Sequence, residues 1–258
     1  MKREFCITET DGHVLTVTID RPDVMNSLHP PANAELGAVF DEFAADPELW
    51  VAIVTGAGDR AFSAGNDLKY QAAGGERTPF PKGFGGLTAR FDLTKPVIAA
   101  VNGVAMGGGF EIALACDLII ASENAVFALP EPRVGLAALA GGLHRLPRQI
   151  GTKQAMGMIL TGRRVSAAEG RTLGFVNEVT APDALMERAR AWAAQICECA
   201  PLSIRASKEV AYGGLAHASL EEAMGARYDG VRAMMESEDF AEGPKAFAEK
   251  RPPQWKGR

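Results

Sequence analysis

The sequence predicts an α/β fold followed by a helical C-terminal region. Short apolar runs typical of buried strands alternate with helical periodicity up to about Pro182, and only helical periodicity follows. The 28 glycines indicate many tight turns between these segments. With 258 residues, 47% of them apolar, the chain is long enough to bury the core of one large domain.

Each element has its own signal. Residues 13–19 alternate apolar and polar side chains, as a half-buried strand does, whereas 51–55 and 97–101 are continuous apolar runs that end at glycine or Asn-Gly turns. Further strands are predicted at 117–121, 125–127 and 176–179, and helices at 33–43, 183–199, 201–213 and 219–236. A last short helix should begin after Ser237, capped by oxygens of Ser237 and Asp239.

Composition excludes several classes of protein. The 27 Lys and Arg against 32 Asp and Glu give a net charge of −5, without the basic cluster that nucleic acid or an anionic membrane surface attracts. The most apolar segment, 97–121, is interrupted by Asn102, Glu111 and Asp117, so it does not predict a membrane span. The charged N-terminus lacks the apolar core of a signal peptide, and we expect a cytoplasmic protein.

The sequence predicts no metal site. The four cysteines are scattered and are interpreted as reduced structural thiols, since no second pair completes a zinc site. The histidines at 13, 29, 144 and 217 show no ligand spacing, and we interpret them as surface or packing residues.

Two glycine-containing turns could present backbone N–H groups to a ligand. One follows the 97–101 strand, where Gly107, Gly108 and Gly109 precede a helix; the other is the AFSAGNDLK segment at 61–69. The first N–H groups of a helix have no partner within it, and two such turns could together hold an oxyanion. A tight packed turn is the structural alternative for the first of them. The irregular stretch 74–86 is either mobile or part of a binding site.

Two glutamates are candidates for proton transfer. Glu111 lies in the first turn of the helix after the glycines, where it either complements the helix dipole or is a buried acid with a raised pKa. Glu131 stands between prolines, in what we expect to be a rigid, extended segment; a surface turn is the alternative.

These motifs, in this order, resemble the crotonase superfamily, also called the enoyl-CoA hydratase/isomerase family, over essentially the whole chain. The matching segments are IDRP with NSL at 19–28, FSAGNDLK at 62–69, KPVIAAVNG at 95–103, GGGFEIALACD at 107–117, FALPE at 127–131, GG at 141–142, RLP at 145–147, TGR at 161–163 and the tail at 237–251. Within the family, FALPE, TGRR, EGPKAFAEKR and the closing WKGR most resemble the carnitinyl-CoA dehydratases.

The resemblance implies roles for particular residues. The backbone N–H groups of Asn66 and Gly108 would form the oxyanion hole for a CoA thioester, and Glu111 and Glu131, twenty residues apart, match the two catalytic carboxylates of hydratases. The substrate-binding residues would be Ala64, Asn66, Asp67, Leu68, Lys69, Gly108 and Leu139. Leu139 departs from the family pattern and should make the acyl pocket more apolar or smaller. It disfavours a trimethylammonium substrate, which would prefer an aromatic or acidic neighbour.

The implied activity is that of an enoyl-CoA hydratase, a hydro-lyase that acts on fatty acyl-CoA esters without a metal or redox cofactor. Coenzyme A enters only as part of the substrate. The alternatives are carnitinyl-CoA dehydratase, another specialised acyl-CoA hydratase or isomerase, and a catalytically inactive acyl-CoA-binding protein.

The resemblance also implies an architecture. The fold would be a ClpP-like, right-handed spiral of ββα units, with residues 1–200 as the core that carries the acyl-CoA site. Residues 201–258 would be a helical region for trimerisation, giving a homotrimer or a hexamer made of two trimers. No nucleic-acid or membrane partner is expected.

Overall fold

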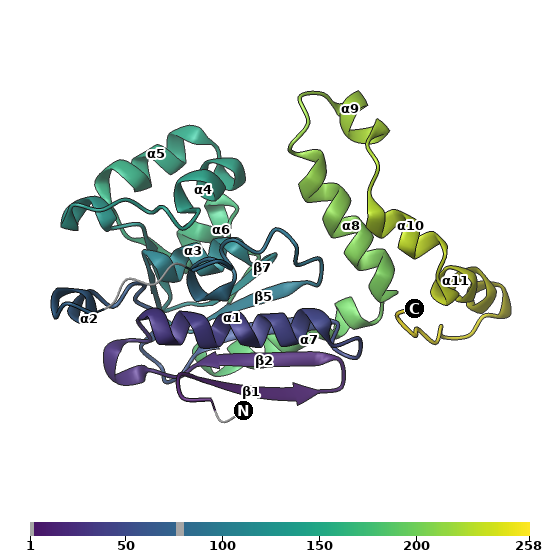
Figure 1. Cartoon of the computed structure of the whole chain (residues 1–258), viewed down its shortest axis with the longest axis horizontal. Coiled ribbons are helices and arrows are strands. Elements are labelled where there is room, and N and C mark those ends of the chain that lie inside the picture. Colours follow the sequence, from purple (N-terminus) through teal and green to yellow (C-terminus); the bar gives the residue numbers. More distant parts are fainter. Residues whose placement is uncertain (1–2, 76–79) are drawn as a thin grey trace.

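Two sheets form the body of the molecule in the computed structural model, which describes residues 3–75 and 80–258 (Figure 1). The six-stranded sheet has the order β1-β2-β3-β5-β7-β10, and only the β1–β2 pair is antiparallel. Its strands are β1 (Cys6–Asp11), β2 (Val14–Ile19), β3 (Val51–Gly56), β5 (Val97–Val101), β7 (Leu118–Ser122) and β10 (Glu178–Thr180). The four-stranded sheet, in the order β4-β6-β8-β9, contains β4 (Ala61–Ser63), β6 (Val104–Met106), β8 (Val126–Ala128) and β9 (Val165–Ser166).

The chain alternates between the two sheets. Strands β3, β5 and β7 are neighbours or near neighbours in the large sheet, and the strand that follows each of them, β4, β6 and β8, lies in the small sheet. A helical segment follows each pair, which gives the repeating ββα units of the predicted fold class. The α/β prediction is therefore confirmed.

The large sheet is covered on both faces, as its continuous apolar strands require. Ala52 and Val54 of β3 face the main core, whereas Val51 and Ile53 face a second apolar cluster. Helix α7 (Leu185–Cys197) contributes Leu185, Ala189 and Ala193 to that second cluster, and α1 (Pro30–Ala45) packs into the main core.

The remaining helices of the body are α2 (Leu68–Ala72), α3 (Gly108–Ala115), α4 (Gly142–Ile150), α5 (Thr152–Thr161) and α6 (Ala167–Leu173). In Figure 1, α4, α5 and α6 lie above β5 and β7 of the large sheet, and the short α2 lies at one side. The predicted strands at 51–55, 97–101 and 125–127 are confirmed within one residue at each end. Sequence reasoning did not identify α4, α5 and α6, partly because α4 starts with glycine and contains Pro147. It also missed β1, a polar edge strand.

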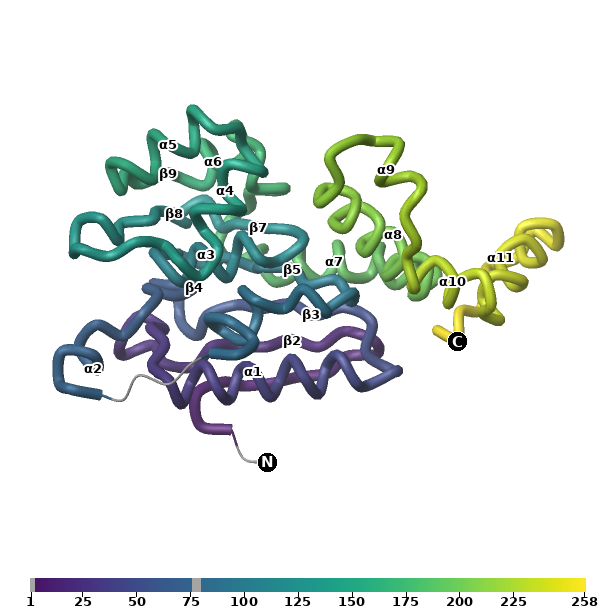
Figure 2. The backbone as a smooth tube through the Cα atoms, turned by 45° about the horizontal axis from the view of Figure 1, so that its top comes forward, coloured from purple at the N-terminus to yellow at the C-terminus, as the bar shows by residue number. Residues whose placement is uncertain are grey.

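Beyond α7, four helices form an arm that extends away from the body (Figure 2): α8 (Pro201–Gly214), α9 (Leu220–Gly225), α10 (Asp229–Met235) and α11 (Glu238–Glu249). The prediction of one helix over 219–236 was wrong. Gly225, a weak helix former, ends α9, and the Tyr228 backbone is extended before α10 begins.

The start of α11 also differs in detail from the prediction. The Ser237 side chain caps the helix as expected, accepting from the N–H of Phe240. Asp239 does not cap it; its buried carboxylate accepts instead from the N–H groups of Lys256 and Gly257, at 2.7 and 2.8 Å, and so fixes the C-terminal tail. Within residues 3–75 and 80–258, no helix combines the length and apolar character needed to cross a membrane.

Candidate active site

The small sheet brings three predicted site residues to one place. Strands β4, β6 and β8 are parallel neighbours, so their carboxyl ends meet at the same edge. Asn66, Gly108 and Glu131 follow these strands within three residues. This common edge is the physical reason that motifs far apart in the sequence lie together.

Glycines allow the two predicted oxyanion turns to touch. A Cβ at Gly65, whose φ is +84°, would lie 2.6 Å from the Met106 carbonyl oxygen and 2.8 Å from the Gly108 nitrogen. A Cβ at Gly109 would collide with the Ser63 carbonyl oxygen. Any side chain at these positions would force the turns apart, so glycine is needed there for close backbone approach.

The N–H groups of Asn66 and Gly108 donate to no other group within the described part of the chain. Both residues line the same cavity. Since a backbone N–H is an obligatory donor, these two groups are available to a ligand oxygen. The Asn66 side chain is occupied, because its Nδ2 donates to Gln71 Oε1 at 2.8 Å.

The segment after β2 holds the first turn in place. Leu28 donates its N–H to the Gly65 carbonyl at 2.8 Å and accepts from the Asp67 N–H at 3.0 Å. The Asn26 side chain, fully buried, donates to the Ala61 carbonyl at 2.7 Å. The NSL motif is therefore a scaffold for the Asn66 turn. The Asp67 side chain caps α2 by accepting from the Tyr70 N–H.

Glu111 is a buried acid at the first turn of α3, with 3% of its surface exposed. Its Oε1 accepts from the Gly142 N–H, at the start of α4, at 2.8 Å. Burial, with a smaller contribution from the nearby Glu131 carboxylate, raises the pKa of Glu111 to about 7, against the lowering effect of the Gly142 N–H. Near neutral pH this carboxyl can therefore both accept and release a proton.

Glu131 differs from its predicted conformation. It begins a 3-10 helix over Glu131–Val134, capped by Pro130, and is not extended; Pro132 favours this because proline is accommodated in the first helical turn. Its Oε1 lies beside Gly107, and its Oε2 is buried without a hydrogen-bond partner among the described residues. Burial raises the pKa of Glu131. An unpartnered buried carboxyl oxygen is suited to contact a ligand.

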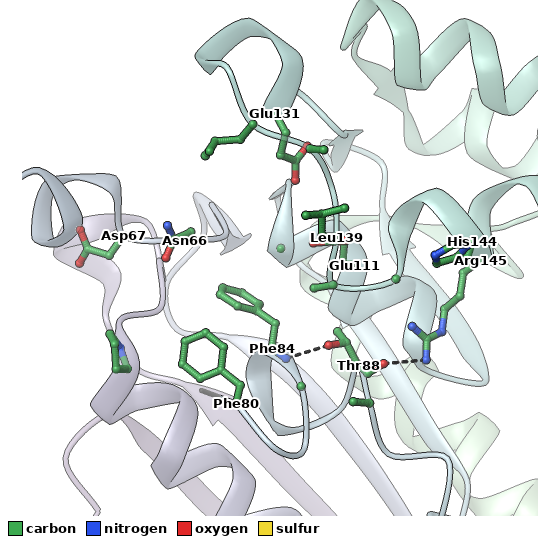
Figure 3. A pocket seen from close by; sticks show the side chains of 18 of the residues that line it. Asn66, Asp67, Phe80, Phe84, Thr88, Glu111, Glu131, Leu139, His144 and Arg145 are labelled. Atoms are coloured by element: carbon green, nitrogen blue, oxygen red, sulfur yellow. Dashed lines mark hydrogen bonds between the residues drawn. The ribbon is translucent and has the colours of Figure 1, made fainter. Parts of the chain in front are cut away.

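A cavity of about 1050 Å³ joins these groups (Figure 3). The residues of both N–H donors and both glutamates line it. The described residues that line it are Pro30, Asn66, Asp67, Tyr70, Gln71, Gly75, Phe80, Gly83, Phe84, Thr88, Ala89, Phe91, Gly108, Glu111, Glu131, Leu136, Ala137, Leu139, Ala140, Gly141, His144, Arg145 and Arg148.

The predicted substrate-binding residues divide into two groups. Asn66, Asp67, Gly108 and Leu139 line the cavity, and Leu139 does so with 80% of its surface exposed. Ala64 lies behind the turn and donates its N–H to the Met25 carbonyl, whereas Leu68 and Lys69 are exposed on α2. None of these three is among the described cavity-lining residues.

Sequence reasoning missed the aromatic part of this wall. Phe80 and Phe84 come from the irregular 74–86 stretch, which was predicted to be either mobile or part of a binding site; residues 76–79 of it lie outside the described residues. His144 was interpreted as a surface or packing residue, yet it lines the cavity. Among the residues described, no group of three or more His, Cys, Asp or Glu could hold a metal ion.

The fold is that of a family of enzymes that act on CoA thioesters. Residues 9–258 match the family model described as enoyl-CoA hydratase/isomerase. The chain therefore belongs to this family, the crotonase superfamily that its motifs resemble.

Two curated relatives are similar to this chain over nearly its whole length. The chain is 48% identical over 256 residues to the carnitinyl-CoA dehydratase of Citrobacter koseri, covering 96% of each chain. It is 49% identical over 257 residues to that of Salmonella typhimurium, covering 96% of this chain and 97% of the relative.

Solved structures agree on the fold. An enoyl-CoA hydratase from Mycobacterium tuberculosis superposes with a TM-score of 0.92 at 37% identity, covering 98% of this chain and 99% of the other. A carnitinyl-CoA hydratase from Mycobacterium avium gives 0.79 at 42% identity, with both chains fully covered.

Proposed function

We propose that the protein is a hydro-lyase that adds water across the C2=C3 bond of a 2-enoyl-CoA thioester, or removes it in reverse. The observation that carries this proposal is the pair of carboxyl groups, Glu111 and Glu131, in one cavity with the free N–H groups of Asn66 and Gly108. Hydration needs a proton acceptor, a proton donor and stabilisation of an oxyanion, and these four groups can supply them.

The oxyanion donors act on the thioester carbonyl oxygen. Attack of water at C3 moves negative charge through the conjugated system onto this oxygen. The N–H groups of Asn66 and Gly108 are already in place to stabilise the resulting enolate, and loss of one such donor typically lowers kcat by ~10²–10³.

The two glutamates transfer the protons. In the hydration direction, Glu111 as carboxylate takes a proton from water while the water oxygen bonds to C3. Glu131 as carboxylic acid delivers its proton to C2. Both carboxyls have raised pKa values because they are buried, so one charged and one protonated form can coexist in the cavity. This scheme uses no metal or redox cofactor. CoA takes part only as the non-reacting part of the substrate.

The names of the relatives indicate carnitinyl-CoA as the substrate, and its dehydration product is crotonobetainyl-CoA. The expectation that Leu139 disfavours a trimethylammonium group considered only one wall of the cavity. Aromatic rings and two carboxyls line the other walls, and both kinds of group attract a quaternary ammonium ion. A general enoyl-CoA hydratase is the second candidate, supported by the similarity to the mycobacterial hydratase fold.

The test follows the loss of enoyl-thioester absorbance with crotonobetainyl-CoA and, separately, with crotonyl-CoA. We expect hydration of both, with the higher kcat/KM for crotonobetainyl-CoA. Equal or faster hydration of crotonyl-CoA would favour the general hydratase. Tight binding of both esters without turnover would contradict the hydro-lyase and indicate an inactive acyl-CoA-binding protein.

We also propose that the protein is a homotrimer or a hexamer of two trimers. The arm leaves large apolar side chains exposed in the single chain, among them Leu215, Leu220, Met224, Phe240 and Phe247. Exposed apolar surface of this kind is typical of protein interfaces. Sedimentation equilibrium should give three or six times the mass of one chain, and a stable monomer would contradict the proposal.

A further inference from the structure

An aromatic wall lies directly beside the proposed oxyanion donors. Phe80 and Phe84 line the cavity, with ring centroids 6.1 Å apart and planes at 84° to each other. The Phe84 ring packs against the Gly108 backbone, since a Cβ at Gly108 would lie 2.5 Å from Phe84 Cε1. Figure 3 shows the two rings between Asn66 and Thr88, with Glu131 on the other side of the cavity.

The turn that carries Phe84 is held rigidly. Gly83, Gly85 and Gly86 all have positive φ angles, of +78°, +62° and +69°. The Phe84 N–H donates to Thr88 Oγ1 at 2.7 Å, and the Gly85 N–H donates to Asn33 Oδ1 of α1 at 2.6 Å. Only 6% of the Phe84 surface is exposed. The ring is therefore positioned before any substrate binds, which lowers the entropic cost of recognition.

The acyl group of crotonobetainyl-CoA has a particular requirement. Its trimethylammonium group carries a full positive charge but has no N–H with which to donate a hydrogen bond. Proteins recognise such groups with the faces of aromatic rings. When the thioester oxygen is bound by Asn66 and Gly108, this group lies only a few bonds away, within reach of the ring that packs against Gly108.

We propose that Phe80 and Phe84 bind the trimethylammonium group of the acyl chain and so determine the substrate specificity of the site. This inference rests on the proposed hydro-lyase function. It names the residues that select among acyl groups, which neither the glutamates nor the backbone donors can do, because every enoyl-CoA presents the same thioester and double bond to them.

The charged side chains of the cavity are compatible with a cationic acyl group near these rings. The Arg145 guanidinium lies beyond Thr88, where it donates to the Thr88 carbonyl at 2.9 Å and lies 5.8 Å from the centroid of the Phe91 ring. Glu111 and Glu131 face the same cavity and, when ionised, attract a cation. In Figure 3 the two rings and Arg145 lie on opposite sides of Thr88.

The experiment compares kcat/KM for crotonobetainyl-CoA with that for its neutral isostere, in which a tert-butyl group replaces the trimethylammonium group. The two compounds share shape and differ in charge. Phe84→Leu and Phe80→Leu keep an apolar side chain but remove the ring. Each should lower the ratio of kcat/KM for crotonobetainyl-CoA to kcat/KM for the neutral isostere by about 5- to 30-fold. Most of this change should be a loss of kcat/KM for the cationic substrate.

Phe5→Leu is the matched control. This phenylalanine is half-buried like Phe80, is not among the described cavity-lining residues, and has its ring centroid 5.9 Å from the Arg21 guanidinium. The ratio of its two kcat/KM values should stay within about twofold of the wild type, because the substitution lies outside the cavity. Turnover of the neutral isostere reports that each variant is folded and active. If Phe84→Leu fails to fold, Phe80→Leu still tests the proposal, because Phe80 is only half-buried.

The outcomes separate the two proposals. An unchanged ratio in the Phe80 and Phe84 variants, or equal losses for both substrates, would overturn the assignment of the aromatic pair and leave the hydro-lyase standing. Absence of hydration of either compound by the wild-type protein would overturn the proposed function, and this inference with it.

Discussion

Glu131→Gln should lower kcat for enoyl-CoA hydration by ~10²–10⁴, the usual contribution of a general acid or base. Glutamine keeps the shape of the side chain but cannot deliver a proton to C2. Binding of the CoA ester should change little, because the proposed thioester contacts come from Asn66 and Gly108. The measurement is single-turnover hydration at saturating substrate, together with a Kd from titration.

The stability of this variant distinguishes a catalytic from a structural role. Burial raises the pKa of Glu131 in the folded protein, and its Oε2 has no described partner. A raised folded pKa contributes stability that is fully present below the pKa of the unfolded chain and is lost as pH rises through the folded value. Above that pH, Glu131→Gln should therefore have a Tm equal to or higher than that of the wild type.

Glu123→Gln supplies the matched control. Glu123 is exposed in the turn between β7 and β8 and does not line the cavity. The same chemical change there should leave both kcat and Kd unaltered. A Glu131→Gln protein that hydrates substrate within threefold of the wild-type rate would contradict the proposed proton transfer.

The sequence predicted the components of the site better than their arrangement. The long apolar runs of β3 and β5 and the triple glycine at the start of α3 have strong local signals, and the structure has these elements where they were expected. Strands β4 and β6 have three residues each, too few for any periodicity to appear. Without them, the common edge of the small sheet could not be inferred, and the pairing of Asn66 with Gly108 rested on the family resemblance.

Sequence patterns could not predict the residues of the cavity wall for a different reason. Phe84 lies in a glycine-rich turn whose conformation depends on positive φ angles and on a distant partner, Asn33 of α1. His144 carries no local signal either, because its place in the cavity depends on where α4 packs against α3. Such positions are determined by tertiary packing, which overrides local propensity.

Gly65→Ala should lower kcat by ~10²–10³, the cost of losing one oxyanion donor. The added methyl group cannot fit, because its carbon would lie 2.6 Å from the Met106 oxygen and 2.8 Å from the Gly108 nitrogen. Backbone cannot yield as a flexible side chain can, so the Asn66 turn and the start of α3 must separate. The N–H groups of Asn66 and Gly108 could then no longer donate to the same oxygen atom. The measurement is kcat for the enoyl-CoA that the wild type hydrates fastest.

Gly174→Ala separates this geometric effect from backbone strain. Gly174 ends α6 with a φ of +102°, and a Cβ there would meet no atom within 4 Å. Both variants place alanine in a left-handed conformation, which costs about 1–3 kcal/mol of stability, so both should have a lowered Tm. Only Gly65→Ala should also lose kcat. Equal kcat values for Gly65→Ala and Gly174→Ala would contradict the proposed oxyanion hole. The close approach of the Asn66 turn to the start of α3 would then only stabilise the fold, and another group would have to stabilise the enolate.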